Sequence, residues 1–254
     1  MRLRVWTVGL VLFLVSVQGC LTLNPATGRE EFLVFTTPLE VMIGQGINAQ
    51  MGMGARTSVN KESADRLERI GHRVAQVSDR QDYEYHFYLV NDDSLNAFTT
   101  PGGNIYFNTG LFNKLNSDDE IAAVLAHEVG HCSARHVAKK FQAAFGYDLL
   151  SGMVMGGIQN DVRRRIARMS ADALVSLGLA AFSRTDENEA DRLGVKYTYL
   201  AGYDPNGLAE AFAVLAAESG DGKDEGWIML RTHPRLADRI AAVKKEIELV
   251  KARY

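Results

Sequence analysis

The stretch that decides the fold runs from Ser117 to Ser133 and has the sequence SDDEIAAVLAHEVGHCS. Ser117 and Glu120 are spaced as in a capping box, so a helix should begin here, and we expect it to run to about Phe141. From Ile121 onward nearly every residue of the stretch is apolar or small, and a helix without a polar face is usually buried in the middle of its domain. This helix should therefore form the centre of the protein.

The same helix carries an HExxH motif, from His127 to His131. Two histidines four residues apart project from one side of a helix, which suits a single zinc ion. Glu128 lies on the adjacent edge, where it can reach a metal-bound water rather than the metal and act as the base in peptide hydrolysis. Burying two histidines and a carboxylate without a metal or partner would be costly, so a zinc site is favoured over histidines that merely pack in the core.

A third protein ligand must come from elsewhere in the chain. The extended pattern HExxHxxGxxH is not met, because Ala134 stands where it needs glycine and His136 is one place out of register. A carboxylate from a second helix is the other common arrangement. The sequence ENEAD supplies Glu187, Glu189 and Asp191 near a helix start, and residues 187 and 191 share one face. Spacing alone leaves Glu187 and Glu189 both open as the ligand.

The rest of the chain predicts a small sheet and several helices. Strands are expected at 83–90, 96–99 and 105–108, with a turn at 101–104, as a small antiparallel sheet. Further helices are expected at 37–51, 63–77, 188–200, 207–217 and 234–251. For residues 145–182, ordinary packing is favoured over a flexible cover of the site. The fold class is thus α+β, a helix-dominated zincin-like domain with its sheet beside the HExxH helix.

The first residues predict export. Arg2 and Arg4 precede an apolar run that ends at Gly19, the layout of a signal peptide over residues 1–19. Residues 17–20, VQGC, resemble the lipobox of bacterial lipoproteins, which would make Cys20 the lipidated N-terminus; a soluble secreted protein is the alternative. By the same resemblance Leu21, in place of aspartate, implies the outer membrane. We expect a tether at 20–36, with turns, and a zinc metallopeptidase domain at 37–254.

Composition limits the function further. The chain has 254 residues, 46% of them hydrophobic and 23% charged, as in ordinary globular proteins. A net charge of -3, with no basic cluster beyond Arg163 to Arg165, excludes a nucleic-acid partner. Cys132 directly follows a histidine of the motif, but neighbouring positions on a helix point about 100° apart. A buried packing role is therefore favoured for Cys132 over a ligand role.

The chain resembles a known family, the HtpX-like zinc endopeptidases related to the CAAX prenyl proteases, and especially periplasmic lipoprotein members similar to the β-barrel assembly-enhancing protease. The resemblance rests on the HExxH helix and on these further motifs: Asn24-Pro25 with Thr27-Gly28, Asn96-Ala97-Phe98 with Pro101-Gly102-Gly103, Ser183-Arg184 before ENEAD, and His233-Pro234. It implies one zinc per chain, Glu187 as third ligand, and Asp191 as a catalytic or second-shell acid near a ligand histidine. The family's spanning helices and helical-repeat domain find no counterpart, so we expect neither a prenylated membrane substrate nor recruitment through repeats.

Two further sites are hypotheses. His233 precedes a proline suited to the first position of a helix, so it either caps that helix or points into the cleft, to donate to the oxyanion or to close the zinc site at rest. The substrate strand is expected to pair with an extended substrate backbone at a sheet edge, and its residues are Asn96, Ala97, Phe98, Gly102 and Gly103. The remaining histidines, at 72, 86 and 136, are expected at the surface or in packing.

Together these features predict a zinc endopeptidase of the bacterial cell envelope, a lipoprotein that faces the periplasm. Its expected partners are unfolded or misassembled envelope proteins as substrates, and the membrane through the lipid anchor. A non-enzymatic assembly factor that uses the same metal to bind clients is the alternative, and Glu128 discriminates because a binding module needs no base. A structural helical lipoprotein without metal ranks third.

Overall fold

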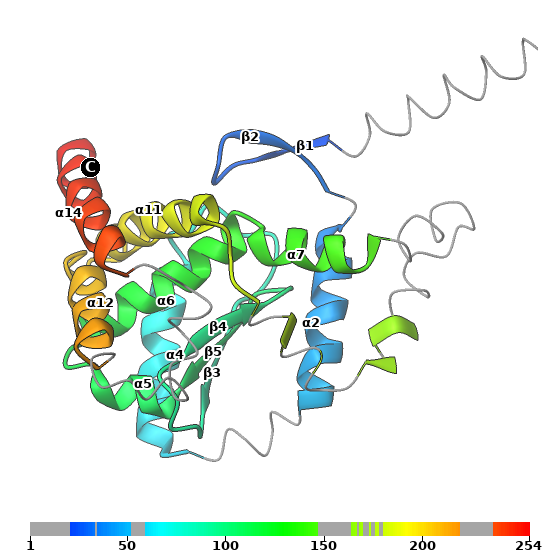
Figure 1. The fold of residues 1–254 in the computed structure, drawn as a ribbon, viewed down its shortest axis with the longest axis horizontal. Coiled ribbons are helices and arrows are strands. Elements are labelled where there is room, and N and C mark those ends of the chain that lie inside the picture. The colour runs from blue at the N-terminus through cyan, green and yellow to red at the C-terminus, as the bar shows by residue number, and fades with distance from the viewer. Residues whose placement is uncertain are drawn as a thin grey trace, which may run out of the picture.

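The computed structural model describes residues 21–33, 35–51, 59–146, 164–166, 168–169, 173, 176–177, 180–218 and 236–254. The elements in chain order (Figure 1) are β1 (Leu21–Asn24), β2 (Arg29–Phe32), α2 (Thr37–Met51), α4 (Lys61–Ala75), β3 (His86–Val90), β4 (Ala97–Thr100), β5 (Asn104–Asn108), α5 (Thr109–Lys114), α6 (Asp118–Ser133), α7 (His136–Ala144), α11 (Arg184–Leu200), α12 (Gly207–Glu218) and α14 (Leu236–Arg253). The helix-dominated α+β class is confirmed.

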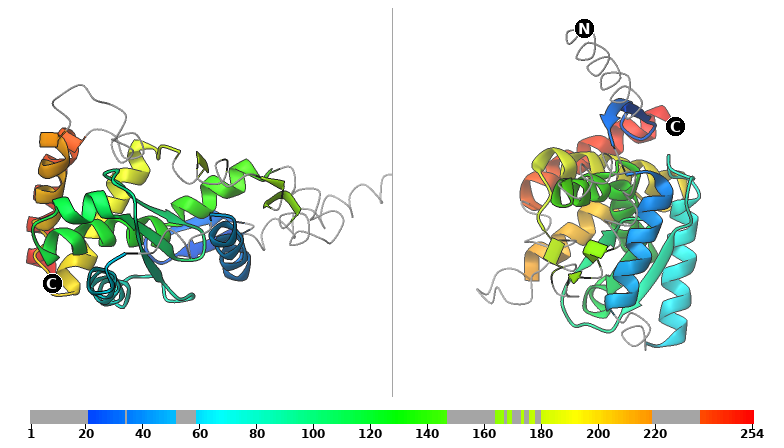
Figure 2. Two further views of the ribbon diagram at one scale, coloured as in Figure 1. Left: turned by 90° about the horizontal axis from the view of Figure 1, so that it is seen from below. Right: turned by 90° about the vertical axis from the view of Figure 1, so that its right-hand side faces the viewer.

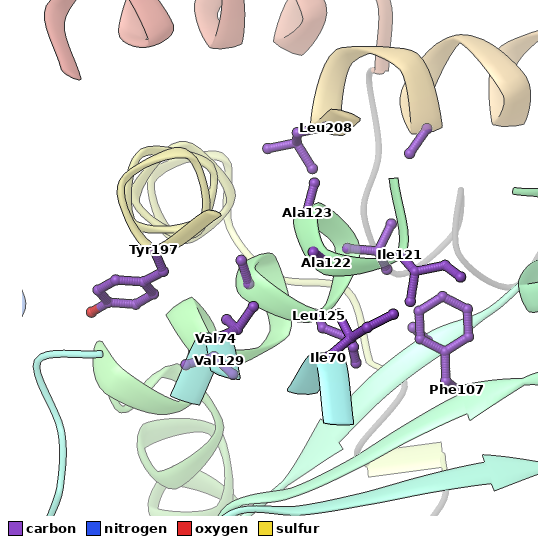
Figure 3. Packing of buried hydrophobic residues seen from close by; sticks show 14 of the residues in the cluster. Ile70, Val74, Phe107, Ile121, Ala122, Ala123, Leu125, Val129, Tyr197 and Leu208 are labelled. Carbon is purple, nitrogen blue, oxygen red and sulfur yellow. The ribbon is translucent and has the colours of Figure 1, made fainter. Parts of the chain in front are cut away.

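Helix α6 lies at the centre, as its sequence predicts. The Ser117 hydroxyl accepts a hydrogen bond from the Glu120 backbone N–H and so caps the helix, and every residue from Glu120 to Ser133 is buried. Helices α4, α11 and α12 and strands β4 and β5 all contact α6. Figure 3 shows how these neighbours enclose it, and the labelled side chains are Ile70, Val74, Phe107, Ile121, Ala122, Ala123, Leu125, Val129, Tyr197 and Leu208.

The sheet has the strand order β3-β5-β4 and is mixed. Strand β4 pairs antiparallel with β5 through the predicted turn, but β3 pairs parallel with β5, which corrects the antiparallel expectation. After β3 the chain passes to the far edge to form β4, then returns between the two earlier strands as β5. The turn requires two glycines, because Gly102 and Gly103 both have φ of +81°.

Both faces of the sheet are covered. Ile105 and Phe107 belong to the core cluster around α6, whereas Tyr106 and Phe98 belong to a second cluster with α2 and α7. A central strand packed on both sides needs apolar residues at successive positions, and β5 is buried throughout. Helix α2 lies at one end of the molecule and α12 and α14 lie at the other (Figures 1 and 2).

The helix that begins after Ser117 is shorter than expected, because it breaks before Phe141. Helix α6 ends at Ser133, Arg135 adopts a left-handed conformation with φ of 59°, and α7 starts afresh at His136. The backbone N–H of Arg135 donates to the carbonyl of Cys132, which tightens the last turn. The Arg135 guanidinium lies 3.5 Å from the buried Glu40 carboxylate, and this ion pair helps to hold a conformation that is unfavourable for a residue with a side chain.

The expected tether contains a hairpin that packs on the domain. Strands β1 and β2 pair antiparallel from Leu21 opposite Phe32 to Asn24 opposite Arg29. A tether with turns alone would leave the polar side chains solvated, but the Asn24 amide donates to the Glu31 carboxylate and both are buried. Lys139 of α7 reaches the same carboxylate, with Nζ 2.6 Å from Oε1. These polar contacts fix the hairpin against α7.

Among the residues described, no helix is long and apolar enough to cross a membrane. The predicted signal peptide, Cys20, His233 and most of the 145–182 segment lie outside the described residues.

Candidate metal centre

Three side chains that could hold a metal converge in the interior. His127 and His131 project from α6, and Glu187 lies in the first turn of α11, which Ser183 and Asp186 start with a capping box. One ligand atom from each of these three residues lies within 4.8 Å of the other two, and all three residues are buried. The two Nε2 atoms are 3.1 Å apart, and Glu187 Oε1 is 3.4 Å from His131 Nε2.

This arrangement fits zinc. Two ligand atoms held 2.0–2.1 Å from one tetrahedral ion lie about 3.3 Å apart, close to the separations between His131 and its two partners. Two imidazole nitrogens and one carboxylate oxygen form a donor set of catalytic zinc sites. Of the two glutamates that spacing left open, Glu187 lies beside the two histidines, whereas Glu189 contacts His136 and Arg29.

Close packing of two helices brings the carboxylate to the histidines. A Cβ atom at Gly130 of α6 would lie 2.9 Å from the carbonyl oxygen of Ala190, and one at Gly194 of α11 would lie 3.1 Å from the backbone nitrogen of His127. Side chains at these two positions would push α6 and α11 apart. The glycines therefore set the distance over which Glu187 must reach.

Asp191 and Arg239 form a buried polar network that contacts two of the candidate ligands, His127 and Glu187. Asp191 Oδ1 lies 3.0 Å from Nδ1 of His127, and Arg239 donates two hydrogen bonds to the Asp191 carboxylate, at 2.8 and 2.6 Å. Burial alone would raise the pKa of Asp191, but its bonds to Arg239 and His127 outweigh burial and lower it. The resulting carboxylate accepts the Nδ1 proton of His127 and so leaves Nε2 of that ring for a metal.

Sequence reasoning missed Arg239. This arginine of α14 also places Nη1 2.6 Å from Glu187 Oε2, so it contacts two carboxylates of the centre. It occupies the buried stripe of α14 that continues through Val243, Ile247 and Val250. An arginine at the head of an otherwise apolar stripe signals a buried anionic partner, and this signal could have been recognised.

Glu128 is fully buried on α6 between the two histidines. Lys140 and Arg239 are near enough to interact electrostatically with its carboxylate. The ring of Phe182 stacks on His131 with 4.0 Å between centroids, and Nζ of Lys140 lies 3.3 Å from the centre of the Phe182 ring. Burial is the main cause that lowers the pKa of Lys140, to about 8.

The other predicted residues lie as follows. Cys132 is buried, and its Sγ forms a hydrogen bond with the Thr99 hydroxyl, as expected for a packing residue. Of the substrate strand, Ala97 and Phe98 lie in β4 at an edge of the sheet and Asn96 is buried just before it. Gly102 and Gly103 pack instead against Glu40, Val41, Tyr83 and Glu84. His72 and His86 are exposed, but His136 is buried against His131.

Comparison with known protein families gives one match to the same part of the chain: the profile of peptidase family M48 matches residues 61–247, which include the three candidate ligands. The chain belongs to peptidase family M48. The M48 chain is 26% identical to the β-barrel assembly-enhancing protease of Yersinia pestis over 93% of its own length and 50% of that protein. It is 31% identical to a putative β-barrel assembly-enhancing protease of Vibrio cholerae, over 68% of its own length and 37% of that protein.

A third relative has nearly the same extent. The metalloprotease LoiP of Escherichia coli is 26% identical to the M48 chain over 90% of each protein. By contrast, the M48 chain spans about half or less of the two β-barrel assembly-enhancing proteases. The family predicted from the sequence is confirmed, and with it the class of metallopeptidase.

Asp191→Asn should weaken zinc binding by about 10- to 100-fold, because a neutral amide holds the His127 proton less strongly than a carboxylate. The measurement is zinc affinity by competition with a chelator of known strength. Asp238→Asn, which changes an exposed acid of α14, serves as the matched control and should leave the affinity unchanged. Equal affinity in both variants would show that Asp191 does not support the ligand.

Proposed function

We propose that this M48 family member is a zinc-dependent endopeptidase with one zinc held by His127, His131 and Glu187. The observation that carries the proposal is the buried cluster of these three ligand atoms within 4.8 Å, with Glu128 between the two histidines on the same helix. Zinc bound there polarises a peptide carbonyl and lowers the pKa of water to about 7. The remaining chemistry falls to residues of the chain.

In this proposal Glu128 moves the proton. Its carboxylate accepts a proton from the attacking water and delivers it to the nitrogen of the leaving amine. Asp191 holds the tautomer of His127, and Arg239 offsets part of the buried negative charge of Asp191 and Glu187. His233 is proposed to stabilise the oxyanion or to close the site at rest.

The proposed substrates are unfolded or misassembled proteins of the cell envelope. Two relatives carry names that refer to β-barrel assembly, and this supports an envelope location and such clients. Strand β4 supports an extended substrate, because an edge strand can pair with a peptide backbone without regard to sequence. We propose further that Cys20 carries a lipid and that the domain faces the periplasm from the outer membrane.

Removal of the metal tests the enzymatic proposal. The mature chain that begins at Cys20, purified in detergent, should cut an unfolded reporter protein, lose this activity completely on dialysis against a chelator, and regain it with one equivalent of zinc. Cleavage products are followed by mass spectrometry, which also reports sequence preference around the cut sites. Cleavage that survives full metal removal would refute the proposal.

A further inference from the structure

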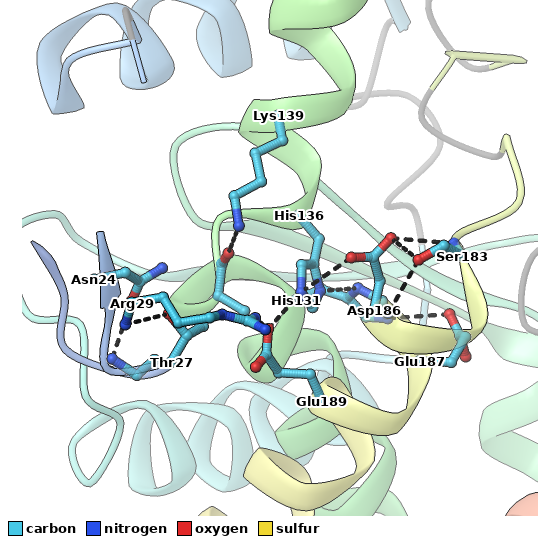
Figure 4. A network of polar contacts seen from close by, with 12 residues as sticks. Asn24, Thr27, Arg29, His131, His136, Lys139, Ser183, Asp186, Glu187 and Glu189 are labelled. Atoms are coloured by element: carbon cyan, nitrogen blue, oxygen red, sulfur yellow. Dashed lines mark hydrogen bonds and ion pairs between the residues drawn. The ribbon is translucent and has the colours of Figure 1, made fainter. Parts of the chain in front are cut away.

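His136 has no role in the mechanism above, but it contacts the ligand histidine His131 at Nδ1, the ring nitrogen that does not face the other ligand atoms. His136 is the first residue of α7, and its Nδ1 lies 3.0 Å from Nδ1 of His131. On the other side of the ring, Nε2 of His136 lies 3.2 Å from Glu189 Oε2. Figure 4 shows His131, His136 and Glu189 as consecutive members of one polar network. The break at Arg135 creates this contact, because residues five apart in a continuous helix point about 140° apart.

One assignment of protons to the ring nitrogens satisfies the contacts that link His131, His136 and Glu189. Nε2 of His131 faces the other ligand atoms, 3.1 Å from His127 Nε2 and 3.4 Å from Glu187 Oε1, so the proton of the neutral ring belongs on Nδ1. That N–H then donates to Nδ1 of His136, which leaves the proton of His136 on Nε2, where it donates to Glu189. The two ligand histidines thus differ: His127 is held directly by a carboxylate, and His131 through an intervening imidazole.

Glu189 is itself fixed from two elements. Nη2 of Arg29, on β2, lies 2.5 Å from Glu189 Oε2, and Arg192 lies on the same side of α11, 3.7 Å from Oε1. The Glu189 carboxylate therefore contacts His136 on one side and two arginines on the other, and the β1–β2 hairpin helps to hold it.

We propose that His136 is a positioning residue for zinc: it accepts the Nδ1 proton of His131 and, anchored by Glu189 and by Arg29 of the hairpin, fixes the orientation of that ligand. The inference rests on the proposed zinc site and adds residues that touch neither the ligand atoms nor a substrate. Outer partners of ligand histidines set metal affinity by holding the ring and its tautomer, so zinc binding, rather than turnover alone, is the property to measure.

The experiment compares His136→Phe, His136→Asn and Glu189→Gln in the mature chain, with His86→Phe as the matched control on an exposed histidine. Zinc affinity is measured by chelator competition, and the geometry of the site by the visible absorption spectrum of the cobalt-substituted protein.

His136→Phe should lower zinc affinity by about 10- to 100-fold and alter the cobalt spectrum. His136→Asn should restore most of both, because its side-chain oxygen can stand where Nδ1 stood. Glu189→Gln should lower the affinity in the same direction as His136→Phe, but by less, because it acts through His136.

Wild-type affinity and an unaltered spectrum in His136→Phe would overturn the inference. If that variant does not fold, Glu189→Gln decides, and wild-type affinity there would overturn the inference equally. Failure of the proposed function gives a different result, since the wild-type chain would then bind no zinc, or would bind zinc without cleaving any substrate. A wild-type chain that binds zinc and cleaves, with variants that bind it equally well, would leave the proposed function standing and reject only the role of His136.

Discussion

Glu128→Gln should reduce hydrolysis of an unfolded protein by about 10²–10⁴-fold while zinc remains bound. Glutamine keeps the length and shape of the side chain but cannot accept the proton of the attacking water. Because Glu128 is not among the three clustered ligand atoms, the metal should stay at one equivalent per chain. The measurement is the initial rate of cleavage by the wild-type and variant chains, with zinc content determined on the same samples.

Glu210→Gln, an exposed glutamate of α12, is the matched control and should cleave at the wild-type rate. Equal cleavage by Glu128→Gln and the wild type would contradict the assignment of the base and point to a contaminating protease. Absence of cleavage by the wild-type chain itself, with zinc bound, would favour the client-binding alternative, in which no base is needed.

Arg239→Met should lower the free energy of unfolding of the metal-free domain by about 3–5 kcal/mol. Methionine fills a similar volume but leaves the buried carboxylates of Asp191 and Glu187 without the guanidinium that contacts both. Breaking a buried ion pair by removing one partner costs more than the pair contributes, because the remaining charge stays desolvated. Urea unfolding in the presence of a chelator measures the change.

The control for this prediction is Arg192→Met, since that side chain is 50% exposed and its ion pair should contribute no more than about 1 kcal/mol. Adding Asp191→Asn to Arg239→Met should recover part of the lost stability, as one unpaired charge is removed with its partner. Similar small losses in Arg239→Met and Arg192→Met would show that the buried network does not stabilise the fold.

Local signals made α6 and its motif predictable. Ser117, the apolar run and HExxH lie within one continuous segment, so capping, burial and ligand spacing can all be inferred together. The ends of the strands and of α2, α4 and α12 follow from similar local patterns and agree within a few residues. Membership of the M48 family followed from motifs spread along the chain.

The features that the sequence did not predict depend on contacts between residues that are far apart in the chain. Arg239 meets Asp191 across 48 positions, and periodicity within α14 gives no partner for it. The parallel pairing of β3 with β5 depends on which edge the intervening strand takes. The sequence predicts His136 at the surface or in packing, and it is buried; its contact with His131 depends on the left-handed Arg135, which the sequence pattern did not predict.

Cys132, the buried thiol next to the ligand histidine His131, differs from an exposed cysteine in its response to oxidants. Burial raises the pKa of Cys132 to about 12. Only the thiolate attacks disulfides and oxidants, so burial keeps Cys132 in the less reactive thiol form at neutral pH. Burial alone thus protects the thiol next to His131, and no second cysteine among the described residues pairs with it.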